Sequence, residues 1–289
     1  MTLLITSLIE NKQIILCADD YAQNTSISEG IVHLAEQGRI NATSCMVNSK
    51  AWNEAHQALH PIQSTTYIGL HFNLTHGDAL SPRWKKNYGV QLPGMASLLK
   101  QSYLRRLNPE VIAAEIMAQL DAYTHAMNAY PDFIDGHQHI HQLPVIREAL
   151  LAVYGDLPPG IFIRKTSNGW LDLLSPDGFP KRQLIALLGG IASRVGKGAS
   201  GDVPTRFTNS SFSGIYNFKD AVNYRHYFKR FLNHSRDGGL IMCHPGNLSE
   251  DVRDPLHLYR HHELGYFMSD EYLSDLDSHS FQLKRKEAK

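Results

Sequence analysis

Short apolar runs alternate along this chain with stretches in which apolar residues recur at helical spacing. The first run, residues 14–18, is followed by a stretch in which Ile27, Ile31 and Leu34 share one helical face. The same order then repeats. The further strands predicted in this way are residues 42–48, 67–73, 133–135, 161–164, 205–209 and 240–244. The further predicted helices are residues 109–127, 144–154, 180–195 and 219–233.

Strands that alternate with helices pair in parallel, through right-handed crossovers. The pattern favours an irregular TIM-like (β/α) barrel of about seven parallel strands, with an open sheet as the alternative. No repeat, low-complexity linker or shift in composition interrupts the chain, so we expect residues 1–289 to form a single domain. Residues 265–289 are expected to form a C-terminal helix and a solvated, charged tail.

Residues 76–107 depart from the alternating pattern. This stretch is irregular, rich in Gly, Pro and basic residues, and it carries Trp84 and Tyr88. A long insertion after a strand is often functional. We therefore expect residues 76–107 to face a substrate, and a surface loop without ligand contacts is the alternative.

The composition narrows the choice of partners. The chain has 28 Lys and Arg against 28 Asp and Glu, so its formal charge is zero. Nucleic acids and anionic membranes reward a basic surface, so neither is expected as a partner. Three cysteines in apolar runs give no disulfide framework, and no apolar run is long enough to span a bilayer. We expect a cytoplasmic protein.

Polar residues that carry chemistry lie at the predicted carboxyl ends of four strands. They are Asp19 with Asp20, then His71, the run from His137 to His141, and His244. Barrel enzymes gather their catalytic groups at this end of the strands. Residues that are far apart in sequence are thus expected to meet at one mouth.

The adjacent carboxylates of Asp19 and Asp20 repel each other and are costly to bury without a cation or a donor. The alternative is a helix-capping aspartate beside a solvated one.

Alternation in the third strand places His71 on the face opposite Ile68, Leu70 and Phe72. A structural histidine is the alternative there.

The run that begins at Asp135 alternates carboxylate and imidazole side chains. Asp135, His137, His139 and His141 would share one side if the segment stayed extended. Imidazole nitrogen suits zinc and other divalent metals, and a nearby carboxylate can orient a ligating ring. Three imidazoles in a row have no packing purpose, so we expect a metal-binding or catalytic role.

His244 ends an apolar strand and precedes Pro245 and Gly246. The sharp turn expected there presents the imidazole at the same mouth, as a candidate proton donor. A buried structural histidine is the alternative.

Arg164 lies at the end of the fifth strand. It would orient Asp19 or bind substrate, and a surface salt bridge is the alternative.

In sequence, the chain resembles the YdjC-like carbohydrate deacetylases, which include the chitooligosaccharide deacetylases. The resemblance covers about residues 14–264. Its matching segments are ILCADDYAQN, RINATSCMVN, IGLHFNLTHG, DFIDGHQHIHQLP and LIMCHPGN. The combination of these segments is specific, whereas any one of them alone would not be.

This resemblance implies a distorted barrel with one divalent metal ion, Mg²⁺ or Zn²⁺. Asp20, His71 and His137 match the metal ligands, Asp19 matches the catalytic base, and His244 matches the acid. Asp135, His139, His141 and Arg164 would then support the ligands or contact substrate. The family usually has glycine two residues after the aspartate pair, where this chain has Ala22.

The implied activity is hydrolysis of an N-acetyl group on an amino sugar or oligosaccharide, which releases acetate and a free amine. Trp84 and Tyr88 would then offer aromatic faces to sugar rings. Another metal-dependent amidohydrolase or phosphoesterase is an alternative, and so is a non-catalytic sugar-binding barrel. The native sugar, the metal and the oligomeric state, monomer or homodimer, stay open.

Overall fold

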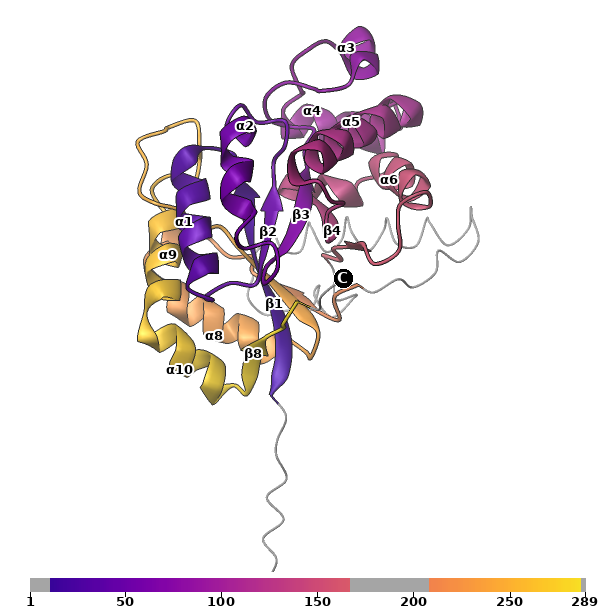
Figure 1. The fold of residues 1–289 in the computed structure, drawn as a ribbon. Coiled ribbons are helices and arrows are strands. Elements are labelled where there is room, and N and C mark those ends of the chain that lie inside the picture. Colours follow the sequence, from indigo (N-terminus) through magenta and orange to yellow (C-terminus); the bar gives the residue numbers. More distant parts are fainter. Residues whose placement is uncertain (1–10, 167–207, 287–289) are drawn as a thin grey trace, which may run out of the picture.

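The computed structural model describes residues 11–166 and 208–286 of the chain (Figure 1). The helix expected at residues 180–195 and the first part of the strand expected at residues 205–209 lie outside the described residues. Within the described part, no helix is both long and apolar enough to cross a membrane.

Among the described residues, seven parallel strands lie side by side in one curved sheet, and an eighth, β8, pairs with β1 outside this row. The predicted TIM-like barrel is confirmed in the form of a half-barrel. In space the strands follow the order β5-β4-β3-β2-β1-β7-β6. Their bounds are β1 Lys12–Tyr21, β2 Ala42–Cys45, β3 Tyr67–Phe72, β4 Phe133–Gly136, β5 Phe162–Ile163, β6 Phe212–Ser213 and β7 Gly239–Cys243. The sixth strand was expected at residues 205–209. The pairing with β7 instead begins at Phe212, opposite Leu240.

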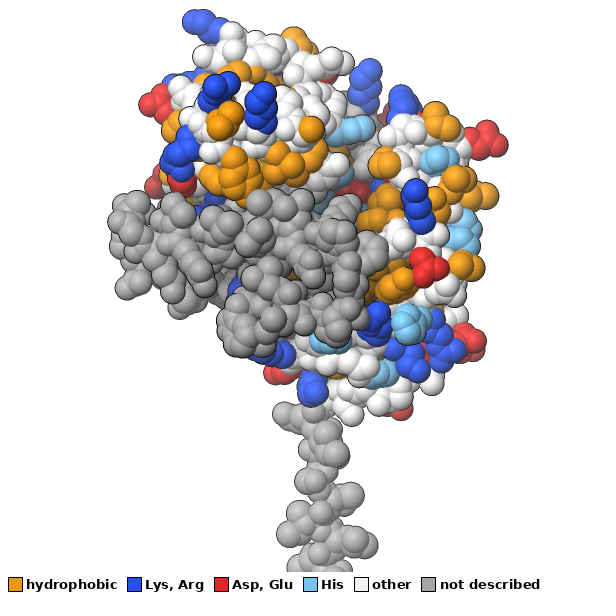
Figure 2. Space-filling model, turned by 180° about the vertical axis from the view of Figure 1, so that it is seen from behind, with side chains coloured by type: hydrophobic (Ala, Val, Ile, Leu, Met, Phe, Trp, Pro, Cys, Tyr) orange, Lys and Arg blue, Asp and Glu red, His pale blue; other side chains and the backbone are white. Residues whose placement is uncertain are grey.

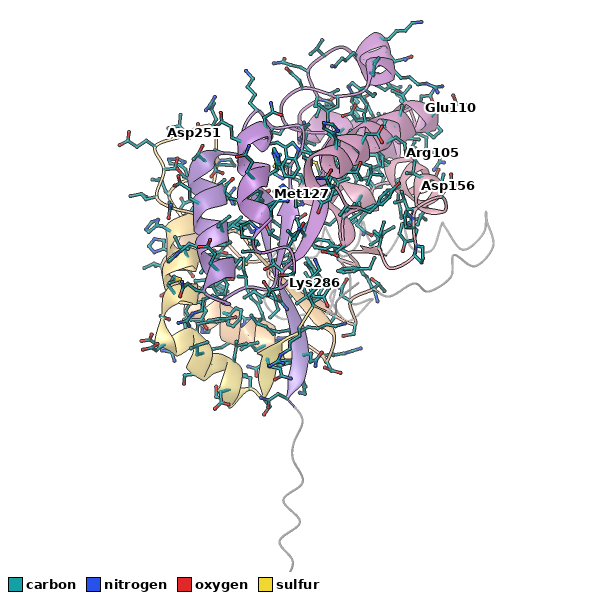
Figure 3. The ribbon with its side chains drawn as sticks, in the orientation of Figure 1. Arg105, Glu110, Met127, Asp156, Asp251 and Lys286 are labelled. Carbon is teal, nitrogen blue, oxygen red and sulfur yellow. The ribbon has the colours of Figure 1, made fainter. Side chains whose placement is uncertain are left out.

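Helices cover the outer side of this sheet (Figure 1). The α-helices are α1 Thr25–Glu36, α2 Trp52–Ala55, α3 Pro82–Tyr88, α4 Met95–Tyr103, α5 Pro109–Met127, α6 Ile146–Tyr154, α8 Tyr224–His234, α9 Arg260–Met268 and α10 Asp270–Ser278. The described residues also form the short 3₁₀ helices η1 His56–Leu59, η2 His137–Gln142 and η5 Phe218–Asn223. Glu110 of α5 pairs with Arg83, and Arg105, in the turn after α4, pairs with Glu148; Arg105 and Glu110 are labelled in Figure 3.

The strands separate two apolar cores. Ile14, Leu16 and Ala18 of β1 pack outward into the large core beneath the helices. Ile15 and Cys17 instead pack into a small core inside the barrel, which is completed by Ala42, Phe133, Phe162, Phe212, Leu240 and Met242. This two-residue alternation fixes which side chains can enter the barrel.

The insertion at residues 76–107 is more regular than its sequence suggested. It contains α3 and α4, and α3 starts with Ser81 as its N-cap and Pro82 at its first position. Trp84 is only 1% exposed and packs against Tyr88 at 5.0 Å between ring centroids. The expected contact of the Trp84 ring with a sugar is therefore wrong.

The C-terminal segment is tied to the sheet, so the expectation of a solvated tail is wrong for its described part. After α9 and α10, β8 (Phe281–Leu283) pairs in parallel with the start of β1. The Lys286 ammonium lies 2.6 Å from a carboxylate oxygen of Asp132 and donates to two backbone carbonyls (Figure 3).

Candidate active site

Asp19 and Asp20 both reach the mouth of the barrel because β1 ends irregularly. Alternation continues from Ile15 and Cys17 to Asp19, which therefore points inward. Regular alternation would send Asp20 outward, but its φ is +68° and the β1–β2 register shifts between Ala18 and Tyr21. An irregularity of this kind re-aims a side chain.

The alternatives considered for this aspartate pair are wrong. Each residue is only 2% exposed, so neither is solvated. Asn24 rather than an aspartate caps α1 by accepting from the backbone N–H of Ile27. Ala22, at the position where glycine was expected, adopts φ +67° without being glycine. The tight turn is thus kept at some cost in backbone strain.

His71 sits on the inner face of β3, as its alternation predicted, and is held from behind. Its Nδ1 lies 2.6 Å from Asp135 Oδ1 and 2.9 Å from the Ser44 hydroxyl. Its Nε2 faces Asp20, 3.3 Å from Oδ1. Burial alone would lower the pKa of His71, but the Asp135 carboxylate outweighs burial and raises it to about 10.

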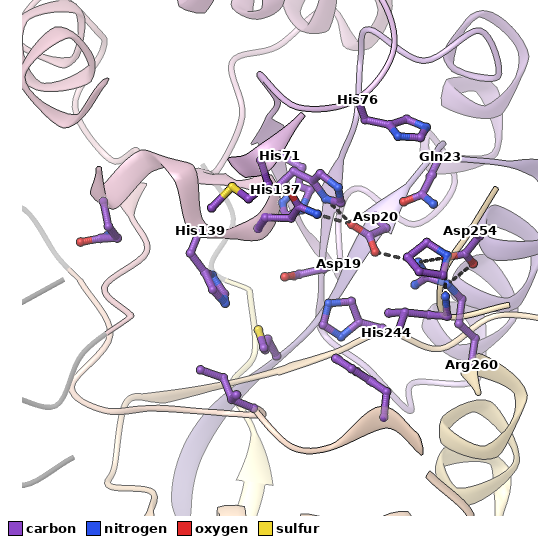
Figure 4. A pocket seen from close by; sticks show the side chains of 18 of the residues that line it. Asp19, Asp20, Gln23, His71, His76, His137, His139, His244, Asp254 and Arg260 are labelled. Carbon is purple, nitrogen blue, oxygen red and sulfur yellow. Dashed lines mark hydrogen bonds and ion pairs between the residues drawn. The ribbon is translucent and has the colours of Figure 1, made fainter. Parts of the chain in front are cut away.

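His137 follows the last residue of β4 and closes the cluster (Figure 4). Its Nδ1 lies 2.9 Å from the same oxygen of Asp20. Burial would raise the pKa of Asp20, but Arg260 and the His137 imidazole outweigh it and hold that pKa well below its usual value. One ligand atom from each of Asp20, His71 and His137 lies within 4.8 Å of the others.

This cluster fits a divalent cation by its chemistry. It offers one carboxylate oxygen and two imidazole nitrogens, a donor set that suits zinc and related ions. Asp135 holds the second nitrogen of His71, as carboxylates commonly do behind metal-binding histidines. Three protein donors would leave further coordination positions for water and substrate.

A second group of possible ligands is formed by Cys17, Asp19 and Asp135. The positive charge within this group is the Arg164 guanidinium. Arg164, fully buried, donates to both oxygens of Asp19 at 2.7 and 2.6 Å and also pairs with Asp135. Its guanidinium also contacts the sulfur of Cys17 at 3.0 Å. Arg164 therefore makes a buried fork onto Asp19, and the alternative of a surface salt bridge is wrong.

The histidine run does not stay extended, so the expectation that its imidazoles share one side is wrong. Gln138 and His139 adopt φ of +54° and +62° within η2, which breaks the two-residue alternation. His139 lies in the cavity wall, edge-on to Phe212. His141 is instead buried outside the cavity lining, with Nε2 3.0 Å from the carbonyl oxygen of Arg164.

His244 leaves the end of β7 and reaches the same cavity from the opposite side (Figure 4). Its backbone N–H donates to Glu263 at 2.6 Å, and its ring lies edge-on to Phe218. Burial lowers the pKa of His244 to about 4, so the imidazole is neutral at pH 7 in the free protein.

One cavity of about 480 Å³ is lined by the side chains of Asp19, Asp20, His71, His137, His139 and His244. One part of its wall is polar and the other is apolar. The apolar lining residues are Met95, Leu99, Leu143, Ile215, Phe218, Met242, Pro255 and Leu256. Met95 and Leu99 belong to α4, so the insertion at residues 76–107 forms part of the wall. Elsewhere on the surface, Lys, Arg, Asp and Glu side chains are scattered over the face seen in Figure 2.

Sequence reasoning missed three residues that support this site. Arg260 and Asp254 form an ion-paired chain onto Asp20, and Glu263 accepts from both His244 and the Tyr216 hydroxyl. All three follow His244 by ten to twenty residues, in a segment without an apolar strand. Two charged residues on one helical turn, Arg260 and Glu263, were the available signal.

Comparison with known proteins places the chain in a family. Residues 13–278 match the model described as YdjC-like protein. The chain belongs to the YdjC-like family. Nearly the whole described structure, including every element that lines the cavity, falls within the matched residues.

Curated relatives in this family carry names of deacetylases. A carbohydrate deacetylase of Mus musculus is 30% identical over 152 residues, which cover 50% of this chain and 48% of that protein. A chitooligosaccharide deacetylase of Enterobacter sp. (strain 638) is 30% identical over 47% of this chain and 53% of its own length. These matches thus span about half the length of each relative. A chitooligosaccharide deacetylase of Citrobacter koseri is 22% identical, over 85% of this chain and 86% of its own.

A solved structure shares the fold of this YdjC-like chain. It is described as a putative cellobiose-phosphate cleavage protein from Enterococcus faecalis, and it superimposes with a TM-score of 0.66 at 16% identity. The match covers 95% of this chain and 97% of the other. The two proteins therefore share their fold at low sequence identity.

Proposed function

We propose that this protein is a metal-dependent carbohydrate N-deacetylase. The observation that carries the proposal is the meeting of Asp20, His71 and His137 in one cavity with Asp19 and His244. Its substrate would be an N-acetylated amino sugar or oligosaccharide of the chitooligosaccharide kind, and its products acetate and a free amine. The names of the family's curated relatives support this choice of substrate.

Asp20, His71 and His137 would hold one divalent ion. Two imidazole donors favour Zn²⁺, while Mg²⁺ would be the choice of an all-oxygen site. When bound, such an ion supplies Lewis acidity that activates water and polarises an acyl carbonyl. His71 would bind through Nε2, because Asp135 and Ser44 hold its Nδ1.

Asp19 would accept a proton from the attacking water. Arg164 donates to both Asp19 oxygens and so fixes the plane of the carboxylate, while each oxygen keeps a lone pair for the proton. Because Arg164 is itself buried between Asp19 and Asp135, the base is held by a network rather than by one contact. Arg164 would act as a positioning residue.

His244 would give a proton to the departing amine. The pKa of about 4 makes this imidazole neutral before the reaction. It must therefore gain a proton within the cavity, and the proton collected by Asp19 is the one that becomes available when water attacks. The balance is one water consumed, one C–N bond broken, and acetate and a protonated amine formed.

The insertion at residues 76–107 would contact the substrate through α4. Met95 and Leu99 stand in the cavity wall, whereas Trp84 is buried. We place substrate contact on α4 rather than on the aromatic residues of α3. Residues 76–107 then form a wall of the site and not a separate domain.

Two other activities compete with this proposal. Metal-dependent amidohydrolases and phosphoesterases often carry paired histidines on the first strand, where this chain has Asp19 and Asp20. A non-catalytic sugar-binding barrel could dispense with a base and an acid, whereas Asp19 and His244 both remain and line the cavity. Both differences favour the deacetylase.

The test is a paired assay on the zinc-loaded protein. We expect acetate from N,N′-diacetylchitobiose and no phosphate from p-nitrophenyl phosphate. Asp19→Asn should abolish most of the acetate, and Asp156→Asn, which changes an exposed aspartate away from the cavity, should not (Figure 3). Phosphate release without acetate release would replace the proposal with a phosphoesterase.

A further inference from the structure

Arg260 is buried beside the proposed metal ligands although it comes from α9, on the far side of the cavity from His71 (Figure 4). Its side chain is 2% exposed, and Nη2 donates to Asp20 Oδ2 at 2.9 Å. This is the oxygen of Asp20 that faces away from the histidines. The other oxygen, Oδ1, lies 3.3 Å from His71 and 2.9 Å from His137.

Asp254 holds the guanidinium of Arg260 in place. Nε of Arg260 donates to Asp254 Oδ2 at 2.6 Å, and Nη2 reaches Oδ1 at 3.1 Å. Asp254 is also buried, with 1% of its side chain exposed. A planar guanidinium that is shared by two carboxylates fixes their relative orientation, which a lysine ammonium cannot do.

The surrounding backbone is packed to make room for this arginine. A Cβ added to Gly246 would lie 3.2 Å from Arg260 Cδ and 3.3 Å from the Ile27 Cα, tighter than ordinary contact. The turn after His244 thus packs between α1 and the aliphatic part of the Arg260 side chain. Such packing leaves the guanidinium little freedom to move away from Asp20.

Charge alone does not explain this arrangement. A buried arginine needs a carboxylate partner, and Asp254 alone would supply one. Arg260 contacts a second carboxylate, and it does so through one oxygen only. The result is an Asp20 side chain whose rotation is blocked and whose Oδ1 alone is presented to the imidazoles.

We propose that Arg260 is a positioning residue which, held by Asp254, restricts Asp20 to binding a metal ion through Oδ1 alone. The inference rests on the proposed function, because it takes Asp20, His71 and His137 as the ligands. A single-oxygen carboxylate beside two imidazoles suits a small ion such as Zn²⁺ or Co²⁺, whereas Ca²⁺ often takes both oxygens of a carboxylate.

The test uses Co²⁺ as the probe, because its visible absorption reports the number and arrangement of its ligands. Wild type is compared with Arg260→Lys, which keeps the positive charge near the ion but loses the planar fork. Arg225→Lys is the matched control, since Arg225 makes a similar fork onto Asp275 outside the cavity. Metal-free protein is titrated with Co²⁺, and affinity and spectrum are recorded together.

We expect Arg260→Lys to weaken Co²⁺ binding by about 10-fold or more, the usual effect of losing a residue that orients a ligand. Its Co²⁺ spectrum should also change as the second Asp20 oxygen becomes free to bind. Arg225→Lys should match wild type in both. Asp254→Asn, which leaves Arg260 in place but weakens its hold, should give the same spectral change with a smaller loss of affinity.

Wild-type affinity and spectrum in both Arg260→Lys and Asp254→Asn would overturn the inference. The inference also fails if the variants melt at lower temperature but bind Co²⁺ as wild type does, because a merely structural role predicts that result. If wild type itself binds no Co²⁺, the metal site of the proposed function fails, and this inference fails with it. The two failures are thus distinguishable in one set of titrations.

Discussion

At the scale of single residues, the backbone of the turn at residues 19–22 is conformationally strained. Asp20 and Ala22 both adopt positive φ, at +68° and +67°, a region in which residues with a side chain are strained. For Asp20 the strained conformation has a function, because it directs a second carboxylate into the cavity. Ala22 carries the same backbone strain, with its methyl group buried in the large core.

Ala22→Gly should therefore stabilise the protein, by about 1 kcal/mol, because glycine occupies this conformation without strain. Urea unfolding of both proteins measures the difference. Ala126→Gly, within α5, is the matched control, and there the same substitution should destabilise by about 1 kcal/mol. Equal destabilisation by both substitutions would show that Ala22 is not strained.

His137 and His141 are expected to differ in their effect on metal binding. His137→Ala removes a proposed ligand, so the purified protein should lose most of its bound zinc. His141 is turned away from the cluster onto the Arg164 carbonyl, so His141→Ala should retain zinc. Metal analysis after dialysis measures both. Loss of zinc from both variants would place His141 among the ligands.

His244→Ala should depend on the leaving group. A sugar amine is strongly basic and must be protonated to depart, whereas a nitrophenolate leaves as a stable anion. We expect kcat/KM to fall about 100-fold or more on an acetamide and much less on nitrophenyl acetate, with metal content unchanged. An equal loss on both substrates would assign His244 to another role, such as stabilising the oxyanion.

At the scale of elements, α9 connects the ends of β1 and β7 to the C-terminal part of the chain. One turn of this helix carries Arg260, which holds Asp20, and Glu263, which accepts from the backbone N–H of His244. The proposed ligand and the proposed acid are thus positioned by the same helix. Burial raises the pKa of Glu263 to about 7, although its two donors and Arg260 oppose that change.

This raised pKa predicts a pH-dependent stability. The folded protein holds the Glu263 proton more tightly than the unfolded chain, whose pKa is near 4.5. The stabilisation is complete below pH 4.5 and is lost as the pH rises through 7. Relative to Glu263→Gln, wild type should lose about 3 kcal/mol of unfolding free energy between pH 4.5 and 7.5. Parallel curves for both proteins over this range would contradict the assignment.

At the scale of the whole molecule, much of the fold could be predicted because alternation in parallel strands is local. Residues 14–18 and 67–73 are mostly apolar. Asp19 follows the first of these runs and His71 lies near the end of the second, so both belong at the mouth of a barrel. The convergence of Asp19, His71 and His244 follows from that rule. The helices of residues 76–107 could also have been found, since Ser81 and Pro82 are a regular helix start.

What the sequence could not supply depends on tertiary contacts. Gln138 and His139 adopt positive φ although neither is glycine, so nothing in the local sequence indicates the bend. For this reason the histidine run was expected to be extended. The contact of Arg260 with Asp20 joins residues 240 positions apart, and no local pattern encodes it. Likewise, the pairing of β8 with β1 links the two ends of the described chain through only three residues.

The central claim is that one ion held by Asp20, His71 and His137 makes this cavity a deacetylase. The most direct test is to add Zn²⁺ stepwise to metal-free protein while measuring both bound zinc and acetate released from N,N′-diacetylchitobiose. Acetate release should rise in proportion to bound zinc and level off at one ion per chain. Acetate release that is independent of bound zinc, or its absence from fully loaded protein, would contradict the account.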